Sequence, residues 1–267
     1  MHAIVCIKSV PDTTEVRINP ETNTLMRSEV ESVISFFDIY AIEEALRLRE
    51  AHGGRVTVVT MGPPNAVKEL REALAMGCDD AVLLCAPEFA GADTLATAYT
   101  LSRAIDKLGS YDIVLCGKQA VDGDTGQVGP GIANRLGIPQ CTYVFKIRDI
   151  DFDRGTIQVE RLLEEGREIA RTRLPALLTV VKDINQPRFP TFRGIRRARR
   201  TEIPTWTGDD LGDDAAPDSF GLDGSATRVI EVFSPPKREG QVELIAGDSV
   251  QEMASILSDK ILAERVI

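Results

Sequence analysis

Residues 111–129 read YDIVLCGKQAVDGDTGQVG, and this stretch decides the fold. Its first part, Ile113–Cys116, is a short, continuous apolar run, which is typical of a strand buried on both faces of a parallel sheet. Its second part, residues 117–129, is rich in glycine and aspartate and is longer than a crossover connection needs. A buried strand followed by such a loop predicts a ligand site at the carboxyl end of a parallel sheet.

The same alternation of strand and helix runs through the first half of the chain. Three further apolar runs are bounded by Gly, Pro or Asp, and three segments with apolar residues at helical spacing lie between them. This order predicts an α/β fold with an open, mostly parallel sheet of the adenine-nucleotide-binding type and helices on both faces. The expected strands are Ala3–Ile7, Val56–Met61 and Ala81–Cys85, and the expected helices are Ala41–Ala51, Asn65–Met76 and Asp93–Leu108.

After Pro139 the pattern changes. Thr156–Leu162 and Arg167–Arg173 flank a Glu-Glu-Gly turn and predict an antiparallel β-hairpin, and Leu174–Val181 is another buried strand. Residues 185–200 then form a loop rich in proline and arginine. Its arginines reverse the charge of an otherwise acidic protein, either as a docking surface or as a solvated face paired with the chain's own carboxylates. They are Arg188, Arg193, Arg196, Arg197, Arg199 and Arg200.

The last quarter of the chain reads as an arm that ends in a helix. Residues 204–240 are rich in Gly, Asp, Pro and Ser with little periodicity, and helical spacing returns at Ser249–Leu262. An arm without a core cannot offset its ordering entropy unless it lies on its own domain or on a partner subunit. We expect one domain of residues 1–200, which includes the loop 185–200, and a C-terminal part of residues 201–267 that packs on a partner.

The composition excludes several classes of function. The net charge of −10 argues against nucleic acid or an anionic membrane as the main partner, and no apolar stretch approaches the roughly 20 residues of a membrane span. The five cysteines form no CxxC pair, so no metal site is expected. With only two histidines, a serine or cysteine triad has almost no base, whereas lysine or carboxylate chemistry stays open. Free cysteines without a signal peptide predict a cytoplasmic protein.

Three loops at expected carboxyl ends of strands suit a phosphate-bearing ligand: residues 60–64, 90–94 and 117–129. Their small residues allow backbone N–H groups to approach an anion, and threonine hydroxyls add donors. For each loop taken alone, turns and helix caps are the favoured explanation. The length of the third loop favours a nucleotide. The chain contains neither GxxxxGK[ST] nor GxGxxG, so the site is not a P-loop and not an ordinary dinucleotide fold.

These segments resemble the beta subunits of the electron-transfer flavoprotein family, and the resemblance covers nearly the whole chain. The most specific piece is Gly117–Asp122, GKQAVD, with the acidic loop that follows it. The supporting pieces are Val5–Pro11 (VCIKSVP), Ala41–Ala45 (AIEEA), Ala73–Asp79 (ALAMGCD), Leu174–Ala176 (LPA) and Asn185–Phe189 (NQPRF).

The resemblance implies a heterodimer with an alpha subunit that carries a redox FAD and receives the C-terminal part of this chain. Most beta subunits of the family bind AMP, and in the electron-bifurcating branch a second FAD takes that place. Residues 90–94, 122–125 and 220–225 resemble that branch, so FAD is expected, with AMP as the alternative. The implied cofactor-binding residues are Cys6, Phe37, Asp38, Met61, Ala90, Gly91, Ala92, Asp93, Thr94, Gly117, Gln119, Asp122, Gly123, Asp124, Thr125, Gly126, Gln127 and Val128.

In that branch NADH gives a hydride to the beta-subunit FAD. One electron then goes to ferredoxin or flavodoxin, and the other goes through the alpha-subunit FAD to an acyl-CoA dehydrogenase, a related dehydrogenase or a quinone reductase. The cofactor supplies this chemistry, so no catalytic residue is expected in this chain, and whether it is an enzyme stays open. The family also places a recognition loop at residues 185–200. The residues it implies for docking are Phe192, Arg193, Arg196 and Arg197.

Two alternatives remain beside this one. Within the family, the dimer is a plain electron shuttle with a structural AMP. Outside it, the chain is a stand-alone ATP-binding α/β protein, which would be expected to carry an SGGxDS loop where residues 8–11 read KSVP.

Overall fold

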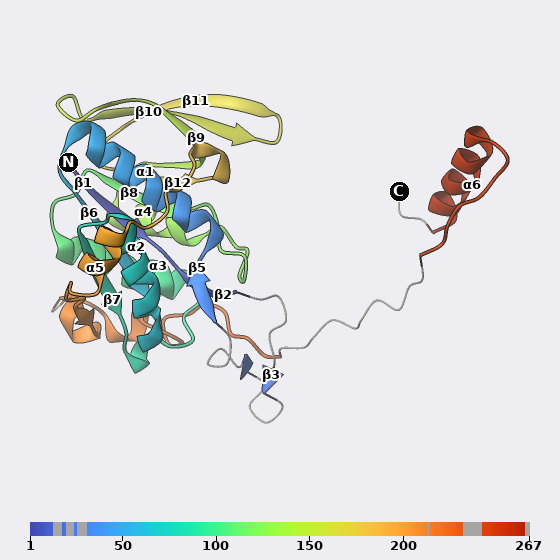
Figure 1. The fold of residues 1–267 in the computed structure, drawn as a ribbon. Helices are drawn as coiled ribbons and strands as arrows, with labels where there is room; N and C mark the ends of the chain where they lie inside the picture. The colour runs from blue at the N-terminus through green and yellow to red at the C-terminus, as the bar shows by residue number, and fades with distance from the viewer. Residues whose placement is uncertain (13–17, 20–23, 26–30, 213, 232–241, 265–267) are drawn as a thin grey trace. The chain divides into compact units, whose positions relative to one another are not determined.

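A computed structural model describes residues 1–12, 18–19, 24–25, 31–212, 214–231 and 242–264. The chain forms two units, Met1–Val232 and Phe233–Ile267 (Figure 1). The sequence places a boundary after residue 200, whereas the structure divides the chain after Val232, because the segment that follows residue 200 joins the main sheet. None of the helices in the described part of the chain has both the length and the apolar character of a membrane span.

Nine strands of the first unit form one sheet in the order β11-β10-β9-β12-β8-β1-β6-β7-β13. Neighbours from β9 across to β13 run parallel, and β9, β10 and β11 are antiparallel, which confirms the predicted mostly parallel sheet with a hairpin. The strands are β1 His2–Cys6, β6 Arg55–Met61, β7 Asp80–Leu84, β8 Ile113–Gly117, β9 Gln140–Asp151, β10 Thr156–Leu163, β11 Gly166–Arg173, β12 Ala176–Val180 and β13 Thr205–Trp206. Two small pairs lie outside this sheet: β2 Ser9–Pro11 with β5 Ser32–Ile34, and β3 Ile18–Asn19 with β4 Thr24–Leu25.

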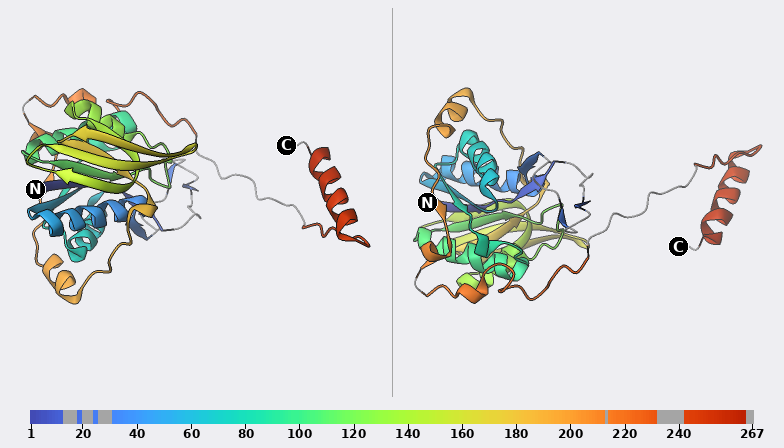
Figure 2. Two further views of the ribbon diagram at one scale, coloured as in Figure 1. Left: turned by 90° about the horizontal axis from the view of Figure 1, so that it is seen from above. Right: turned by 90° about the horizontal axis from the view of Figure 1, so that it is seen from below.

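Helices cover both faces of the sheet (Figure 2). α1 and α2 pack on one face, and α3 and α4 pack on the other, each through a separate cluster of buried apolar side chains. The helices are α1 Phe36–His52, α2 Val67–Met76, α3 Thr94–Leu108, α4 Val128–Leu136 and α5 Phe192–Ala198. Short 3-10 helices are η2 Pro64–Ala66, η3 Pro87–Phe89, η4 Lys182–Ile184, η5 Gly208–Leu211 and η6 Pro217–Ser219.

The two helical layers explain why the central strands are apolar without alternation. In β1, Ala3 and Val5 belong to the cluster under α1, whereas Ile4 and Cys6 belong to the cluster under α3. Every residue of β1 is buried. Because successive side chains of a strand point to opposite faces, a strand covered on both faces needs apolar residues at every position.

Two helices differ from the sequence prediction. α1 begins at Phe36, before the expected start at Ala41, and its extra turn carries two phenylalanines, which are weak helix formers. Inside the predicted loop 185–200, Phe192–Ala198 forms the short helix α5. The side chain of Thr191 caps α5 by accepting a hydrogen bond from the Gly194 backbone N–H at 3.0 Å. Packing on α2, which no local pattern reveals, stabilises this helix.

The first part of the predicted arm lies on its own domain. β13 extends the sheet beside β7, and Leu211 and Phe220 are buried in the α3-side core. The Phe220 ring makes an edge contact with the Phe89 ring and a tilted contact with the Tyr99 ring, with centroids 5.2 and 5.4 Å apart. The composition left open whether the arm packs on its own domain or on a partner subunit. This part of the arm packs on its own domain.

The second unit contains one helix, α6 Val250–Ala263, close to the predicted bounds. The side chain of Ser249 caps it by accepting a hydrogen bond from the Glu252 backbone N–H at 3.2 Å. Apolar side chains of this helix are exposed, including Val250 at 74% and Leu257 at 47%.

Truncation of the buried aromatic in the arm tests this packing. Phe220→Ala should lower the free energy of unfolding by about 3 kcal/mol, because it removes a buried ring from the core. Ile230→Ala is the matched control, because Ile230 follows in the same segment but is 94% exposed. Chemical denaturation measures both. Equal, small effects of the two variants would contradict the placement of this segment in the core.

Candidate functional site

The strand order creates a topological switch point at β1. From β1 the chain builds β6 and β7 to one side, with α1 and α2 on one face of the sheet. It then returns through α3 on the other face to β8, on the other side of β1. In open α/β sheets, ligands bind beyond the carboxyl edge at such a point.

A buried carboxylate joins the ends of β1 and β8. Asp38 lies in the first turn of α1 and is 7% exposed. Its two oxygens accept hydrogen bonds from the backbone N–H groups of Lys8 and Gly117, each at 2.8 Å. Burial raises the pKa of Asp38 to about 7, although these two hydrogen bonds lower it. Asp38 thereby sets the spacing of the loops that follow the two strands.

Only glycine fits at position 117. A Cβ atom there would lie 2.5 Å from Oδ1 of Asp38 and 2.6 Å from Cβ of Phe37. The absence of a side chain lets the start of the acidic loop approach the first turn of α1 and form the hydrogen bond described above.

The acidic loop between β8 and α4 is tied back to the sheet and to itself. Lys8 Nζ lies 2.7 Å from Oδ1 of Asp122, and the Gln119 amide donates to the carboxylate of Asp124. Asp124 has a left-handed backbone with φ of 51°, and its N–H donates to the Ala120 carbonyl at 2.7 Å. These contacts fold the loop over the end of β1.

The far end of this loop meets the N-terminus of α3. The Thr94 hydroxyl donates a hydrogen bond to Oε1 of Gln127 at 3.0 Å. A cavity of about 380 Å³ lies here between α3 and α4. It is lined by Thr94, Leu95, Ala98, Gln127, Gly131, Asn134 and Arg135. The acidic loop therefore connects the β1–β8 crevice to the start of both α3 and α4.

The two helix N-termini differ in how their N–H groups are satisfied. Asp93 caps α3 by accepting from the N–H groups of Leu95 and Ala96 at 2.9 and 3.1 Å. At α4, no side-chain cap and no acidic residue of the first turn is found in the described part of the chain. Pro130 has no N–H and the Gly131 N–H donates to the Gln127 carbonyl at 2.9 Å, so the start of α4 offers an anion the N–H groups of Val128 and Gly129 and a positive helix dipole.

Asp93 also forms hydrogen bonds with Ser225 and Thr227, farther along the arm. Its second oxygen accepts from both the N–H and the hydroxyl of Thr227, at 2.9 and 3.0 Å. Its own N–H donates to the Ser225 hydroxyl at 2.8 Å. These hydrogen bonds from capping groups and Thr227 lower the pKa of Asp93 in spite of the opposing effect of burial. Asp93 is thus a structural residue of the α3 start, and the segment 221–227 forms part of the site's wall.

Comparison with known proteins identifies the family. Residues 22–211 match the electron transfer flavoprotein domain. The chain belongs to the electron transfer flavoprotein family. It is 49% identical over 268 residues to "Electron transfer flavoprotein subunit beta" of Thermoanaerobacterium thermosaccharolyticum, covering all of both chains. It is 46% identical over 267 residues to the protein of the same name from Clostridium acetobutylicum, again covering all of both. It is also 47% identical over 266 residues to "Protein FixA" of Bradyrhizobium diazoefficiens, covering 98% of this chain and 91% of the relative.

The residues implied for the cofactor site of this flavoprotein chain fall into two groups along the same edge of the sheet. One group surrounds the ends of β1 and β8, and the other surrounds the starts of α3 and α4. Cys6 is 6% exposed in the α3-side core, so only its backbone is placed to face a ligand. Met61, at the end of β6, is half-buried. The first group is Cys6, Phe37, Asp38, Gly117, Gln119, Asp122, Gly123 and Asp124, and the second is Ala90, Gly91, Ala92, Asp93, Thr94, Thr125, Gly126, Gln127 and Val128.

The residues implied for partner docking are not equivalent in the structure. The Phe192 side chain is 94% exposed at the start of α5. Arg193 and Arg196 are exposed, and neither makes an ion pair within the described residues. Arg197 is different, because its guanidinium donates to the carbonyls of Leu74, at 2.9 Å, and Cys78 at the end of α2.

Two residues at the site carry roles that sequence reasoning did not assign. Lys8, within the VCIKSVP motif, ties the acidic loop to β1, and the motif itself was the signal that could have pointed to it. Thr227 lies 134 residues from its partner Asp93, and no local pattern connects them.

Removal of the Asp38 charge tests the link between β1 and β8. Asp38→Asn should lower the free energy of unfolding by about 1–3 kcal/mol, because the new amide NH₂ faces a backbone N–H and leaves it unpaired. The effect should also depend on pH, since the pKa rises from 3.8 to about 7 on folding. The folded wild type binds more protons between these values, so the stability that this group contributes is complete below about pH 4 and is lost as the pH rises to about 7.

The difference in unfolding free energy between wild type and Asp38→Asn should therefore narrow from about pH 4 to 7 and stay constant above it. Denaturation over a pH series measures it. Asp153→Asn, which removes an exposed negative charge from the turn between β9 and β10, is the control. A constant difference across the series would mean that Asp38 is ionised throughout.

Proposed function

We propose that this chain is the beta subunit of a cytoplasmic, heterodimeric electron-transfer flavoprotein of the bifurcating branch, and that it binds FAD along the carboxyl edge of its sheet. Family membership supports the flavoprotein role. The single observation that carries the site assignment is the uncapped start of α4, which borders a cavity of about 380 Å³ at the end of the acidic loop.

The residues present fit a nucleotide with a pyrophosphate. Its negative charge suits the N–H donors at the start of α4, with the Thr125 hydroxyl as a further donor. The Thr94 hydroxyl would become another donor on turning from Oε1 of Gln127 to the phosphate. The start of α3 suits it less, because Asp93 already occupies the N–H groups there and adds a negative charge. Gly129 brings α4 close to the sheet, since a Cβ atom there would lie 2.6 Å from Cγ2 of Thr179. The adenosine part would extend from α4 toward the β1–β8 crevice at Asp38 and Gly117.

When bound, FAD supplies the redox chemistry, which is hydride acceptance from NADH and single-electron delivery to ferredoxin or flavodoxin and, through the alpha-subunit FAD, to a dehydrogenase partner. The chain's own side chains bind and orient the cofactor. Lys8 holds the acidic loop over the site through Asp122, and Asp38 keeps the crevice at a set width. None of these roles requires a proton transfer by a side chain.

Counting flavins distinguishes FAD from AMP at this site. The purified heterodimer should contain two FAD, and Thr94→Ala combined with Thr125→Ala should lose one. The double variant removes the Thr125 donor and the Thr94 hydroxyl, which holds Gln127 at the end of the acidic loop. Thr97→Ala, one turn further along α3, is the matched control. Flavin absorbance and nucleotide extraction measure the content. One flavin and one AMP per dimer, with AMP lost in the double variant, would favour the plain shuttle instead.

The segment 185–200 supports a second part of the proposal, which is docking of an acyl-CoA dehydrogenase or a related partner. Phe192 is almost fully exposed. Arg193 follows it directly and Arg196 lies one helical turn later, and both are exposed and without an ion pair in the part of the chain that the structure describes. An exposed aromatic ring that fills a partner pocket is typical of an interface hot spot, and surrounding arginines steer the encounter with an acidic surface.

Phe192→Ala should raise the apparent KM for the dehydrogenase about tenfold or more while leaving NADH-dependent flavin reduction unchanged, because the ring lies on α5, away from the sheet edge that holds the cofactor. Arg196→Glu should slow association and flatten its salt dependence. Ile169→Ala, an exposed apolar side chain on the hairpin, is the control. If Phe192→Ala abolished flavin reduction and left the KM unchanged, the segment would belong to the cofactor site.

A further inference from the structure

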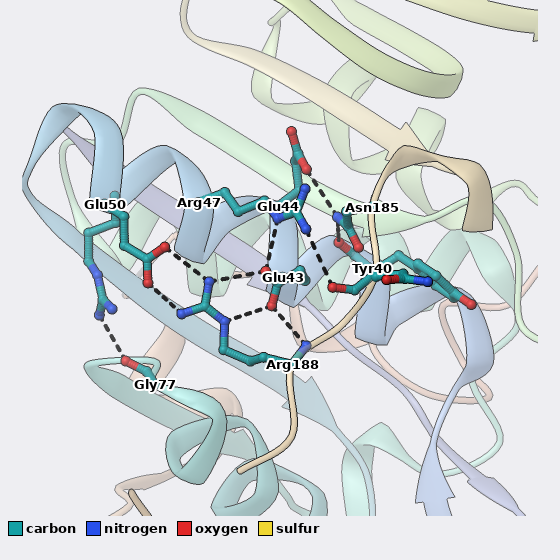
Figure 3. A network of polar contacts seen from close by, with 10 residues as sticks. Tyr40, Glu43, Glu44, Arg47, Glu50, Gly77, Asn185 and Arg188 are labelled. Carbon is teal, nitrogen blue, oxygen red and sulfur yellow. Dashed lines mark hydrogen bonds and ion pairs between the residues drawn. The ribbon is translucent and has the colours of Figure 1, made fainter. Parts of the chain in front are cut away.

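Arg188 is held on α1 by two carboxylates at once (Figure 3). Glu43, whose side chain is 3% exposed, accepts from the backbone N–H of Arg188 at 3.1 Å, from Nε at 2.8 Å and from Nη2 at 3.0 Å. Glu50, two turns along α1, accepts from Nη2 at 3.0 Å and also from Nη1. Arg47 adds a hydrogen bond to Glu43 at 2.9 Å, so this buried carboxylate stays paired from two sides. We call Glu43, Glu50 and Arg188 the α1 clamp.

Asn185 fastens the chain three residues earlier. Its side-chain NH₂ donates to the Tyr40 carbonyl and to Oε2 of Glu44, each at 3.0 Å (Figure 3). The segment that follows β12 is therefore attached to α1 by four guanidinium hydrogen bonds of one arginine and by one side-chain amide.

A second attachment follows Phe189 and Phe192 in the chain and joins α5 to α2. Gly194 of α5 packs so closely on α2 that a Cβ atom there would lie 2.1 Å from the carbonyl oxygen of Ala75. Arg197 donates to the carbonyls at the end of α2, and Arg71 of α2 donates to the Ala198 carbonyl. The chain between Arg188 and Gly194 is thus fixed at both ends to the two helices of the same layer.

The short stretch between these attachments carries two exposed aromatic rings. Phe189 is 91% exposed and Phe192 is 94% exposed, with only Pro190 and Thr191 between them. Exposed rings of this size are costly in water, and aromatic side chains, phenylalanine among them, are enriched in the buried cores of interfaces. Proline and the Thr191 cap further restrict the backbone that presents them.

We propose that Phe189 is a second docking residue beside Phe192, and that the α1 clamp is the positioning element that presents both rings to the partner. This inference rests on the proposed docking of a dehydrogenase on the segment 185–200. The partner surface that fits is an apolar pocket for two aromatic rings with carboxylates at its rim. Arg193 follows Phe192 directly, Arg196 lies one helical turn later on α5, and neither makes an ion pair within the described residues.

The physical reason is preorganisation. A surface segment that must be ordered on binding loses affinity to the entropy of ordering, and a segment already fixed at both ends does not. The bidentate contacts of Arg188 give directionality that a lysine could not reproduce. Loss of the clamp should therefore weaken binding without changing electron transfer within the bound complex.

The test uses the heterodimer and its dehydrogenase. Phe189→Ala should raise the apparent KM for the dehydrogenase about fivefold, and Arg188→Gln should raise it about tenfold, with kcat at saturating partner and NADH-dependent flavin reduction unchanged. Glu50→Gln should give a smaller increase of about threefold, and it leaves the buried Glu43 carboxylate paired, so the test survives if Arg188→Gln fails to fold. Arg154→Gln is the matched control, because Arg154 is an exposed arginine paired with Asp151 on the hairpin side of the unit.

The double variant Arg188→Gln with Phe189→Ala separates positioning from mere stability. If the clamp presents the ring, Phe189→Ala should have less effect in the Arg188→Gln background than in the wild type. Wild-type KM values in Phe189→Ala and in Glu50→Gln, together with a raised KM in Phe192→Ala, would overturn this inference and leave the docking proposal standing. A wild-type KM in Phe192→Ala as well would overturn the docking proposal itself.

Discussion

The hydrogen bonds of Asp38 hold together the two strand ends at which we propose the cofactor site. β1 and β8 are neighbours in the sheet, but the helices that follow them, α1 and α4, pack on opposite faces. The sheet alone therefore does not hold the loops after β1 and β8 together. One buried carboxylate bridges them through two backbone N–H groups. Its low exposure makes the charged form costly, and the pKa is raised accordingly. Gly117 is part of the same constraint, since a side chain there would collide with the carboxylate.

The N-termini of α3 and α4 differ in role: the first stabilises the fold, and the second is where we propose that the ligand binds. α3 is closed by Asp93, which also receives the Thr227 end of the arm. α4 is left open, with glycines at its start that let it approach the sheet and α3. A capped helix stabilises the fold, whereas an uncapped one keeps N–H donors available for an anion. The contrast gives a physical reason to place the phosphates at α4.

The proposed docking surface and the proposed cofactor site are stabilised in different ways. Its exposed rings cannot be stabilised by burial within the chain, so charged contacts at both ends hold the backbone that carries them. Glu43 can serve as one anchor because burial, which raises its pKa, is outweighed by the hydrogen bonds from Arg188 and Arg47, and the net pKa is lowered. The carboxylate therefore stays charged in its buried position, and the ion pair with Arg188 persists.

The sequence by itself determined the layers of this protein, and it predicted where the candidate site lies. Continuous apolar runs such as Ala3–Ile7 must be covered on both faces, and this requirement leads directly to a parallel sheet between two helical layers. The long glycine- and aspartate-rich loop after Ile113–Cys116 marked the functional edge. Only the tertiary structure decided which polar side chains hold that edge together. Asp38 and Gly117, Asp93 and Thr227, and Glu43 and Arg188 are separated by 79, 134 and 145 residues along the chain, and pairs so distant leave no periodicity to detect. The burial of Phe220 could not be predicted either, because the glycine- and proline-rich arm around it has no periodicity. Phe220 is buried against Phe89 of η3 and Tyr99 of α3, which lie far from it in the sequence.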